Sequence, residues 1–581
     1  MNSPAQQTHQ ARKPTFAELF TPKLVTVLRD GYGLARLRAD LVAGLTVAIV
    51  ALPLSMAIAI ASGTTPERGL YTAVVGGFLI SAFGGSRFQI GGPAAAFTVL
   101  VALTVNRVGL DGLFLATIMA GVFQLAIGFL RLGTYVKFIP FPVTVGFIAG
   151  IALTLLAGQI HDLLGLTLAG HEPAEFVPKL QALWGGIGTL KPAAVLVALA
   201  TIGIIAGFKK LQPQWPGMLI AIIVVSIAGA VLSLPIDTIG TRFGGIPSSL
   251  PLPSLPSFSL VKMQAVFPDA ISFALLGAVE SLLSAVAADG MTGRRHRSNM
   301  ELAAQGLANI GSALFGGICA TGTIARTATN VRAGATSPVA GMAHAGFVLL
   351  FILVAAPLAS FIPLASLAGV LVVVSWNMVE KHELLTLLRS SRGDAVVLLT
   401  TIGLTIFRSL TEAIVVGFSL GALLFIHRMA QSTDVQMQGP SVPDDQADDS
   451  HGTRTPYDPR VATDPDVAAY RITGAFFFGG AATVGTVLDS IGDRHKAFVI
   501  DFSAVPFIDS TAANTIGTVA RKAERSGVSL LISGASSAVR QSLLSYGVRP
   551  PTVTYEQSLD DAIATAHKQI TSLKQPKFET M

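Results

Sequence analysis

The sequence predicts a polytopic α-helical membrane protein that carries a small soluble α/β domain near its C-terminal end. Three observations lead to this fold class. Hydrophobic residues make up 51% of the chain and charged residues only 13%, whereas soluble domains average about 25% charged residues. Apolar segments follow one another closely between residues 41 and 430. After residue 430 the chain becomes polar and then alternates between strand-like and helix-like patterns, which is typical of an α/β domain.

About fourteen apolar segments are expected in the membrane part, arranged as a 7+7 inverted repeat. They lie near residues 41–61, 69–84, 93–105, 112–130, 141–159, 190–207, 217–234, 268–289, 299–316, 323–333, 339–357, 366–379, 394–408 and 410–428. The third and tenth are too short to cross a bilayer alone, because a spanning helix needs about 20 apolar residues. An odd number of spans in each half inverts the second half relative to the first, as in many secondary transporters.

The changes in composition divide the chain into five parts. Residues 1–40 are polar and form an N-terminal tail, with a short interfacial helix expected around Phe16 to Leu28, and residues 41–430 form the transmembrane domain. Residues 431–465 contain prolines and several aspartates and are expected to be a linker. The α/β domain covers residues 466–570, and residues 571–581 are a C-terminal tail.

The α/β domain is expected to contain a small parallel or mixed sheet. Residues 467–472, 497–502 and 528–533 have the apolar, β-branched and aromatic character of buried strands. Residues 481–491 and 511–526 between them have helical spacing. About 110 residues are enough for one such domain.

Basic residues indicate the orientation of the membrane part. With the N-terminus inside, the predicted inner loops carry Arg87, the group Arg294, Arg295 and Arg297, and other lysines and arginines, while the outer loops hold fewer. This bias predicts that both termini lie in the cytoplasm; the expected location is the bacterial inner membrane. No face concentrates basic residues as a nucleic-acid site does, so nucleic acid is not an expected partner.

The two short segments predict one small binding site. A polar, glycine-rich helix at membrane depth is tolerated only where protein or a cavity surrounds it, and a pair of interrupted segments in corresponding positions points to a transporter's site. We expect two half-helices whose N-termini face each other. The expected substrate-binding residues are Pro93, Ala94, Ala95, Ala96, Gly322, Thr323, Ile324, Ala325 and Arg326. The alternative is that these small residues only permit close helix packing.

A carboxylate in the eighth segment suggests how transport is coupled. Burying Glu280 in a membrane span costs about 2.5–3.5 kcal/mol, so such a residue is a functional candidate, and Ser284 lies on the same helix face. Two helix N-termini supply about one positive charge, Arg326 adds another, and ionised Glu280 removes one. Protonation of Glu280 therefore makes the site better suited to a dianion. Alternatively, Glu280 is a structural partner of Arg326, or Arg326 faces a lipid headgroup or the opposite repeat.

Enzymatic activity has no support in the sequence. It contains no metal-ligand cluster, nucleophile motif or phosphate-binding loop, so no metal and no cofactor are expected. The expected partners are a small anion, protons and membrane lipid. Two rival functions remain open: a passive anion channel or exchanger, which would not accumulate its anion, and a membrane sensor, which would bind a ligand without flux.

The chain resembles the SulP family of anion transporters, known in animals as solute carrier family 26. The resemblance is nearly full length and includes Gly69–Tyr71, Gly91–Ala94, Gly290–Asn299 and Asn330–Gly334, and the signature of the family's STAS domain at Asp501–Thr511. It implies fourteen helices, a mobile core domain (helices one to four and eight to eleven), a gate domain, a homodimer and elevator-type alternating access.

Within the family, residues 277–283, 289–293 and 325–338 most resemble the enterobacterial C4-dicarboxylate member. This implies proton-coupled uptake of succinate, fumarate or aspartate, with a sulfate or bicarbonate symporter or exchanger as the alternative. Sodium-coupled bicarbonate members carry Asp at 280 and Thr at 284 and 324. Because this chain has Glu280, Ser284 and Ile324, sodium is less expected than protons. Sulfate carriers often have Gln where this chain has Leu54.

The STAS domain carries one regulatory candidate. In related soluble STAS proteins a serine after the aspartate of the signature is phosphorylated, which makes Ser510 and Thr511 a candidate phosphosite. The alternative is that this stretch simply caps the following helix, with Asp509 or Ser510 as the N-cap. The domain could instead bind a nucleotide or a cytosolic protein partner.

Overall fold

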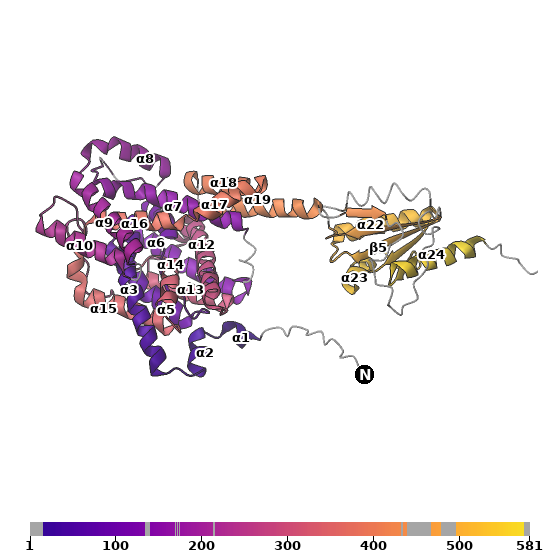
Figure 1. The fold of residues 1–581 in the computed structure, drawn as a ribbon, viewed down its shortest axis with the longest axis horizontal. Coiled ribbons are helices and arrows are strands. Elements are labelled where there is room, and N and C mark those ends of the chain that lie inside the picture. The colour runs from indigo at the N-terminus through magenta and orange to yellow at the C-terminus, as the bar shows by residue number, and fades with distance from the viewer. Residues whose placement is uncertain are drawn as a thin grey trace, which may run out of the picture. The chain divides into compact units, whose positions relative to one another are not determined.

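The structure is a computed structural model. It describes residues 15–133, 140–168, 170, 172–173, 175–212, 215–408, 410–431, 434–437, 466–477, 481 and 495–574. Its internal contacts divide the chain into two units, Met1–Ser419 and Leu420–Met581. The first consists mainly of packed helices, and the second contains a sheet with helices on it (Figure 1).

Each of the fourteen predicted apolar segments overlaps a helix in the described part of the chain. In order these are α3 (Leu34–Ala61), the continuous run α4 (Pro66–Tyr71), η1 (Thr72–Gly76) and α5 (Gly77–Phe83), then η2 (Ala95–Phe97) with α6 (Thr98–Phe129), α7 (Phe141–Leu164), α9 (Pro192–Leu211), α10 (Gly217–Val231), α12 (Leu260–Thr292), α13 (Ser298–Leu314), α14 (Ile324–Arg332), α15 (Val339–Ala359), α16 (Leu364–Met378), α18 (Arg392–Phe407) and α19 (Leu410–Gln431). The shorter helices are α1 (Phe16–Phe20), α2 (Lys23–Arg29), α8 (Phe176–Gly185), η4 (Ile187–Thr189), α11 (Ile239–Phe243) and α17 (Lys381–Ser390). Among the described residues, eight helices are long and apolar enough to cross a membrane.

Helix α6 accounts for two predicted segments, the third and the fourth. Gly109 interrupts it with φ 73° and ψ −177°, which is not a helical conformation. Glycine adopts such a positive φ without the steric penalty of a Cβ atom. The break separates a first piece that begins at the predicted site from a second piece that packs on neighbouring helices.

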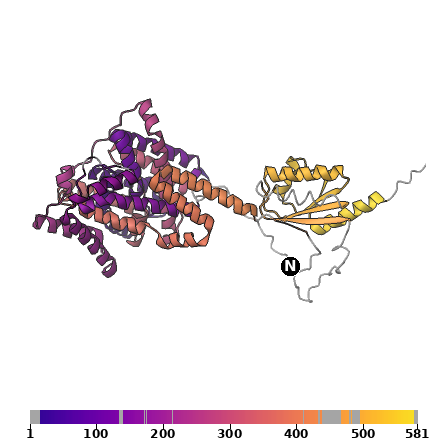
Figure 2. The same cartoon turned by 90° about the horizontal axis from the view of Figure 1, so that it is seen from above.

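The helices of the membrane unit form two packed groups. In one group, α6 packs on α12 and α13, and α3 packs on α15. Gly121 and Gly306 allow α6 and α13 to approach closely, because a Cβ atom on Gly121 would lie 2.6 Å from the carbonyl oxygen of Gly306. In the other group, α16 packs on α7 and α9, α18 packs on α7, and α10 packs on α9. These groups correspond to the core and gate domains that the family resemblance implies. Figure 2 shows the same helices seen from above.

The second unit contains a five-stranded mixed sheet in the order β3-β4-β5-β6-β7. Its strands are β3 (Asp434–Met437), β4 (Val467–Thr473), β5 (Ala497–Ala504), β6 (Ser529–Ser533) and β7 (Val553–Glu556). Strand β3 is antiparallel to β4, and the other neighbours are parallel. The predicted strands at 467–472, 497–502 and 528–533 are confirmed. Residues 434–437, which the sequence placed in the linker, form β3 because they pair with β4.

Helices cover both faces of this sheet, as Figure 1 shows. They are α22 (Ser510–Arg525), α23 (Ser537–Ser545) and α24 (Leu559–Lys574). Ile516 of α22 belongs to a buried cluster with Ile500, and Ala566 of α24 belongs to a second cluster with Val499. Because successive side chains of a strand point to opposite faces, the two clusters lie on opposite faces of β5. The predicted helix at 481–491 lies outside the described residues apart from Ala481.

Candidate functional site

The two interrupted segments meet as a short antiparallel ribbon inside the membrane unit. Strand β1 (Gly91–Pro93) pairs with β2 (Ala320–Gly322), with Gly91 opposite Gly322 and Pro93 opposite Ala320. The pairing gives hydrogen-bond partners to backbone groups that lipid could not satisfy. Both strands then lead into helices, so the N-terminal ends of η2–α6 and α14 start from the same ribbon. Helix N-termini carry partial positive charge and free N–H groups that attract anions.

Side chains tie this ribbon to the helices around it. The Thr323 amide donates to the carbonyl oxygen of Ile90 at 3.0 Å, and the Ile90 amide donates to Oγ1 of Thr327 at 3.1 Å. The Gln89 Nε2 donates to Oγ of Ser281 in α12 at 2.7 Å. These bonds join the start of α14 to the strand before η2. The two half-helix N-termini are therefore held in one fixed arrangement.

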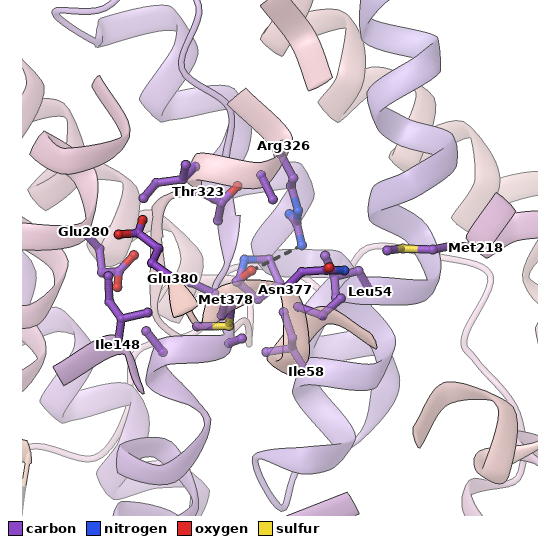
Figure 3. Close-up of a pocket in the computed structure, with 17 residues that line it drawn as sticks. Leu54, Ile58, Ile148, Met218, Glu280, Thr323, Arg326, Asn377, Met378 and Glu380 are labelled. Carbon is purple, nitrogen blue, oxygen red and sulfur yellow. Dashed lines mark hydrogen bonds between the residues drawn. The ribbon is translucent and has the colours of Figure 1, made fainter. Parts of the chain in front are cut away.

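A cavity of about 290 Å³ lies against the two N-termini. Helices of both groups contribute to it, and Figure 3 shows the residues around it. Its lining residues are Leu54, Ile58, Pro93, Ala94, Ala95, Ala96, Ile148, Met218, Glu280, Thr323, Ile324, Ala325, Arg326, Val374, Asn377, Met378 and Glu380. The described residues thus give the cavity one cation and two carboxylates among apolar walls.

Arg326 is the cation of the cavity. Its side chain is almost fully buried, and its Nη2 donates to Ser55 Oγ at 3.1 Å. The same Nη2 donates to the carbonyl oxygen of Pro93 at 3.2 Å (Figure 3). Its Nε and Nη1 have no hydrogen-bond partner among the described residues. Because a buried charge without an anionic partner is costly, the guanidinium favours an anion in the cavity that Arg326 lines. A role of Arg326 at a lipid headgroup does not fit its burial.

Glu280 enters the same cavity from α12. It makes no ion pair or hydrogen bond with another described residue, although its carboxylate lies within the membrane unit. In particular, the described part of the chain shows no ion pair between Glu280 and Arg326, so their structural partnership is not supported. A carboxylate that faces a cavity rather than a protein partner remains accessible to a proton.

The gate group supplies residues that sequence reasoning missed. Glu380 and Asn377 line the cavity at the end of α16, and Figure 3 shows the Glu280 and Glu380 side chains turned toward the same part of it. Lys209 Nζ of α9 donates to Asn377 Oδ1 at 3.0 Å. The only sequence signal for these residues is that Asn377 lies near the end of the predicted apolar segment 366–379 and that Glu380 follows it directly. Which cavity they face depends on how the gate helices pack on the core helices.

Comparison with known proteins identifies the family. Residues 37–401 match the model of the Sulfate permease family, and residues 458–562 match that of the STAS domain. The chain belongs to the sulfate permease (SulP) family. The protein is therefore a multi-pass membrane protein that transports anions. The family resemblance that the sequence motifs indicated is confirmed. Its relatives are transporters, which agrees with the expectation of no enzymatic activity.

Relatives of this SulP transporter are named for two inorganic anions. It is 40% identical over 522 residues to "Putative sulfate transporter YvdB" of Bacillus subtilis, covering 89% of this chain and 95% of the relative. It is 31% identical over 526 residues to "Bicarbonate transporter BicA" of a Picosynechococcus species, covering 87% and 90%. These names correspond to the alternative substrates and do not support the special resemblance to a dicarboxylate member.

Solved structures show the same fold. The transmembrane domain of a cyanobacterial bicarbonate transporter BicA aligns with a TM-score of 0.60 and 33% identity over 66% of this chain and 98% of that one. The murine solute carrier 26 family member A9 anion transporter, in its inward-facing state, aligns with a TM-score of 0.83 and 18% identity over 97% of each chain. At that identity the second likeness shows the fold alone.

Two of the predicted site residues of this SulP protein lie off the cavity. Gly322 is part of β2 and pairs with Gly91. Ser284 is fully buried, and its hydroxyl shares a hydrogen bond of 3.0 Å with Oγ1 of Thr327. One helical turn after Glu280, α12 faces α14 instead of the cavity. Ser284 therefore joins two core helices, and its expected place beside the coupling carboxylate needs correction.

The candidate phosphosite lies at the start of α22 in the STAS domain. Asp509 is the N-cap, and its Oδ1 accepts a hydrogen bond of 2.9 Å from the amide of Ala512. Ser510 and Thr511 are exposed. Asp509 therefore caps α22, as the alternative interpretation expected. The hydroxyl groups of Ser510 and Thr511 remain accessible at the surface.

Proposed function

We propose that this SulP protein is a secondary active transporter that takes up a small dianion together with protons. The observation that carries the proposal is the buried Arg326 guanidinium, with two unpartnered N–H groups beside two helix N-termini. Fixed donors that need no reorganisation bind an anion more strongly than solvated ones do. Glu280 in the same cavity is the proposed site of the coupling proton, and no metal or cofactor takes part.

Charge arithmetic supports a dianion. Two N-termini contribute about one positive charge and Arg326 a second, while ionised Glu280 and Glu380 together contribute two negative charges. The cavity is then close to neutral. Protonation of Glu280 leaves one more positive charge to face the anion, so a proton and a dianion favour each other's binding.

We rank sulfate first among the substrates because the relative at 40% identity is named for it. Bicarbonate, for which the BicA relatives are named, is a monoanion and needs less positive charge. C4-dicarboxylates are the second candidate. Leu54, Ile148 and Val374 form apolar walls that suit the methylene carbons of succinate or the vinylene carbons of fumarate. Sulfate has no such apolar part.

We further propose that the core group moves against the gate group by elevator-type alternating access, as a homodimer with both termini in the cytoplasm. The cavity lies between the two groups, so a rigid shift of the core would carry Arg326 and Glu280 past Asn377 and Glu380. A protein partner of the STAS domain and phosphorylation of Ser510 or Thr511 remain proposals that the exposed start of α22 permits.

Uptake into proteoliposomes tests the proposal. Labelled sulfate, bicarbonate and fumarate are supplied in turn, with an inward gradient of protons, of sodium, or of neither. We expect the proton gradient alone to drive sulfate accumulation, and Arg326→Gln to abolish it, with the exposed Arg408→Gln variant as a control that keeps it. Accumulation driven by sodium alone would overturn the coupling, and flux that only equilibrates would indicate a channel or exchanger.

A further inference from the structure

Four cations gather at one end of the core helices, where three distant parts of the chain meet. They are Lys23 at the start of α2, Arg87 after α5, and Arg294 and Arg297 between α12 and α13. Arg297 holds the three parts together: its Nη1 donates to the carbonyl oxygen of Thr21 at 2.7 Å and to Oγ1 of Thr26 at 2.9 Å. We call these four residues the cationic cluster.

Backbone bonds fix the same arrangement. The Lys23 amide donates to the carbonyl oxygen of Gly84 at 2.9 Å, and the Arg297 amide donates to that of Gly85 at 2.9 Å. Val27 of α2 is buried against the core. The cationic cluster is therefore built into the fold and does not depend on chance positions of long side chains.

Carboxylates do not balance the cationic cluster. Arg87 pairs with Asp30 at 3.1 Å, and Asp289 is engaged by His296 at 2.7 Å. Lys23, Arg294 and Arg297 make no ion pair with a described carboxylate. Lys23 is half-buried, and its burial together with Arg297, Arg87 and Arg294 lowers the pKa of its ammonium group below the usual range. Among the described residues, three of the four cations therefore have no carboxylate partner, and their positive charge favours a bound anion.

An apolar rim adjoins the cationic cluster. Phe16 stacks on Phe20, which stacks on Phe129 at the end of α6, with ring centroids 4.5 and 5.4 Å apart. Phe16, Phe129 and Leu28 of α2 are each more than half exposed. Short amphipathic helices with exposed aromatic and aliphatic side chains beside basic residues lie in the interface between lipid headgroups and acyl chains.

We propose that the cationic cluster binds the phosphate headgroup of an anionic membrane lipid, whose acyl chains lie along the apolar rim. A general excess of basic residues in loops orients a membrane protein, but it does not require four cations to converge on a half-buried lysine. An anionic headgroup supplies the missing negative charge, and acyl chains cover the rim. A soluble phosphate would supply only the charge. This proposal does not depend on the transported anion.

Binding of a fluorescent phosphatidylglycerol to the full-length protein in neutral detergent tests it. The double variant Lys23→Gln with Arg294→Gln removes two unpaired cations, and we expect its affinity to fall roughly 25-fold, since each basic residue near an anionic surface contributes about fivefold. The control, Lys210→Gln with Arg389→Gln, removes the same charge from exposed residues elsewhere, and we expect no change.

Three further arms make the result decisive. Arg294→Gln with Arg295→Gln alters only exposed side chains and leaves the α2 contacts intact, so weakened lipid binding in that variant cannot come from unfolding. Unlabelled phosphatidylglycerol should displace the probe, and phosphatidylcholine should not. Displacement by inorganic phosphate as effective as that by the lipid would overturn the lipid assignment, as would unchanged lipid affinity in both cluster variants.

Discussion

Gly92 lies directly against the guanidinium group of Arg326, so closely that a Cβ atom at position 92 would overlap Nη1. This contact joins the two half-helix segments, because Gly92 belongs to β1 and Arg326 to α14. The position of the one cation in the cavity thus depends on a missing side chain in the other repeat.

We therefore expect Gly92→Ala to displace Arg326 and weaken substrate binding. Loss of one hydrogen bond from a charged group costs about 1.5–3 kcal/mol, which corresponds to a rise in KM of roughly tenfold to a hundredfold. Initial rates of sulfate uptake at several concentrations measure this. Gly203→Ala in α9 is the matched control, since nothing lies within 4 Å of a Cβ atom there. Equal KM values for the two variants would contradict the role of the contact.

Glu280→Gln should make transport independent of pH. With Glu280 present, uptake is expected to rise as pH falls, because protonation removes a negative charge from the cavity and strengthens its attraction for a dianion. Glutamine has a similar shape and stays neutral, so uptake at high pH should approach the wild-type rate at low pH, while accumulation driven by a proton gradient is lost. The measurement is uptake across a pH series with equal pH on both sides. A pH profile that survives the substitution would exclude Glu280 as the proton site.

Glu380→Gln should increase the affinity of the cavity for the anion. Its carboxylate lines the cavity opposite the core residues, and like charge repels an approaching dianion. We expect KM for sulfate to fall and its dependence on ionic strength to weaken, because screening then matters less. Glu383→Gln, three residues further along the chain and outside the cavity lining, is the comparison. An unchanged KM for Glu380→Gln alone would place that carboxylate outside the anion path.

Asp501 should be the most sensitive polar position of the STAS domain. Its buried carboxylate accepts bonds from Arg471 Nε at 2.6 Å, from the Ser503 amide at 3.0 Å and hydroxyl at 2.8 Å, and from the Ser533 hydroxyl at 3.2 Å. Asp501→Ala removes the acceptor of all four bonds, and since Arg471 is partly exposed, we expect a loss of about 2–4 kcal/mol.

Limited proteolysis of the full-length protein, with increasing denaturant, measures the stability of that domain. Asp560→Asn on the exposed first turn of α24 serves as the control. Similar protease resistance in both variants would show that the Asp501 network contributes little. Because the site in the membrane unit is left intact, proteoliposome uptake by Asp501→Ala further reports whether transport needs a folded STAS domain.

Local sequence patterns were enough to predict the fold class, the position of each membrane segment and three strands of the STAS sheet. Hydrophobic runs and their breaks carry this information locally, because a membrane span or a buried strand must be apolar wherever it packs. Local sequence also predicted the two half-helices. A proline such as Pro93 suits the start of a helix, and a polar segment such as the start of α14 is tolerated at membrane depth only where protein or a cavity surrounds it. Residues such as Arg326 and Glu280 stand out because charge at membrane depth is costly.

Local patterns do not reveal which of these residues meet, because that depends on how distant segments pack. Sequence spacing placed Ser284 beside Glu280, but one turn further along α12 the hydroxyl of Ser284 meets Thr327 of α14 instead of the cavity. Glu380 and Asn377 reach the cavity because α16 packs against α3, a contact between segments far apart in the chain. Strand β3 forms inside a polar stretch because β4 offers a partner. In each case the deciding free energy comes from contacts between distant segments, and no local pattern of residues contains it.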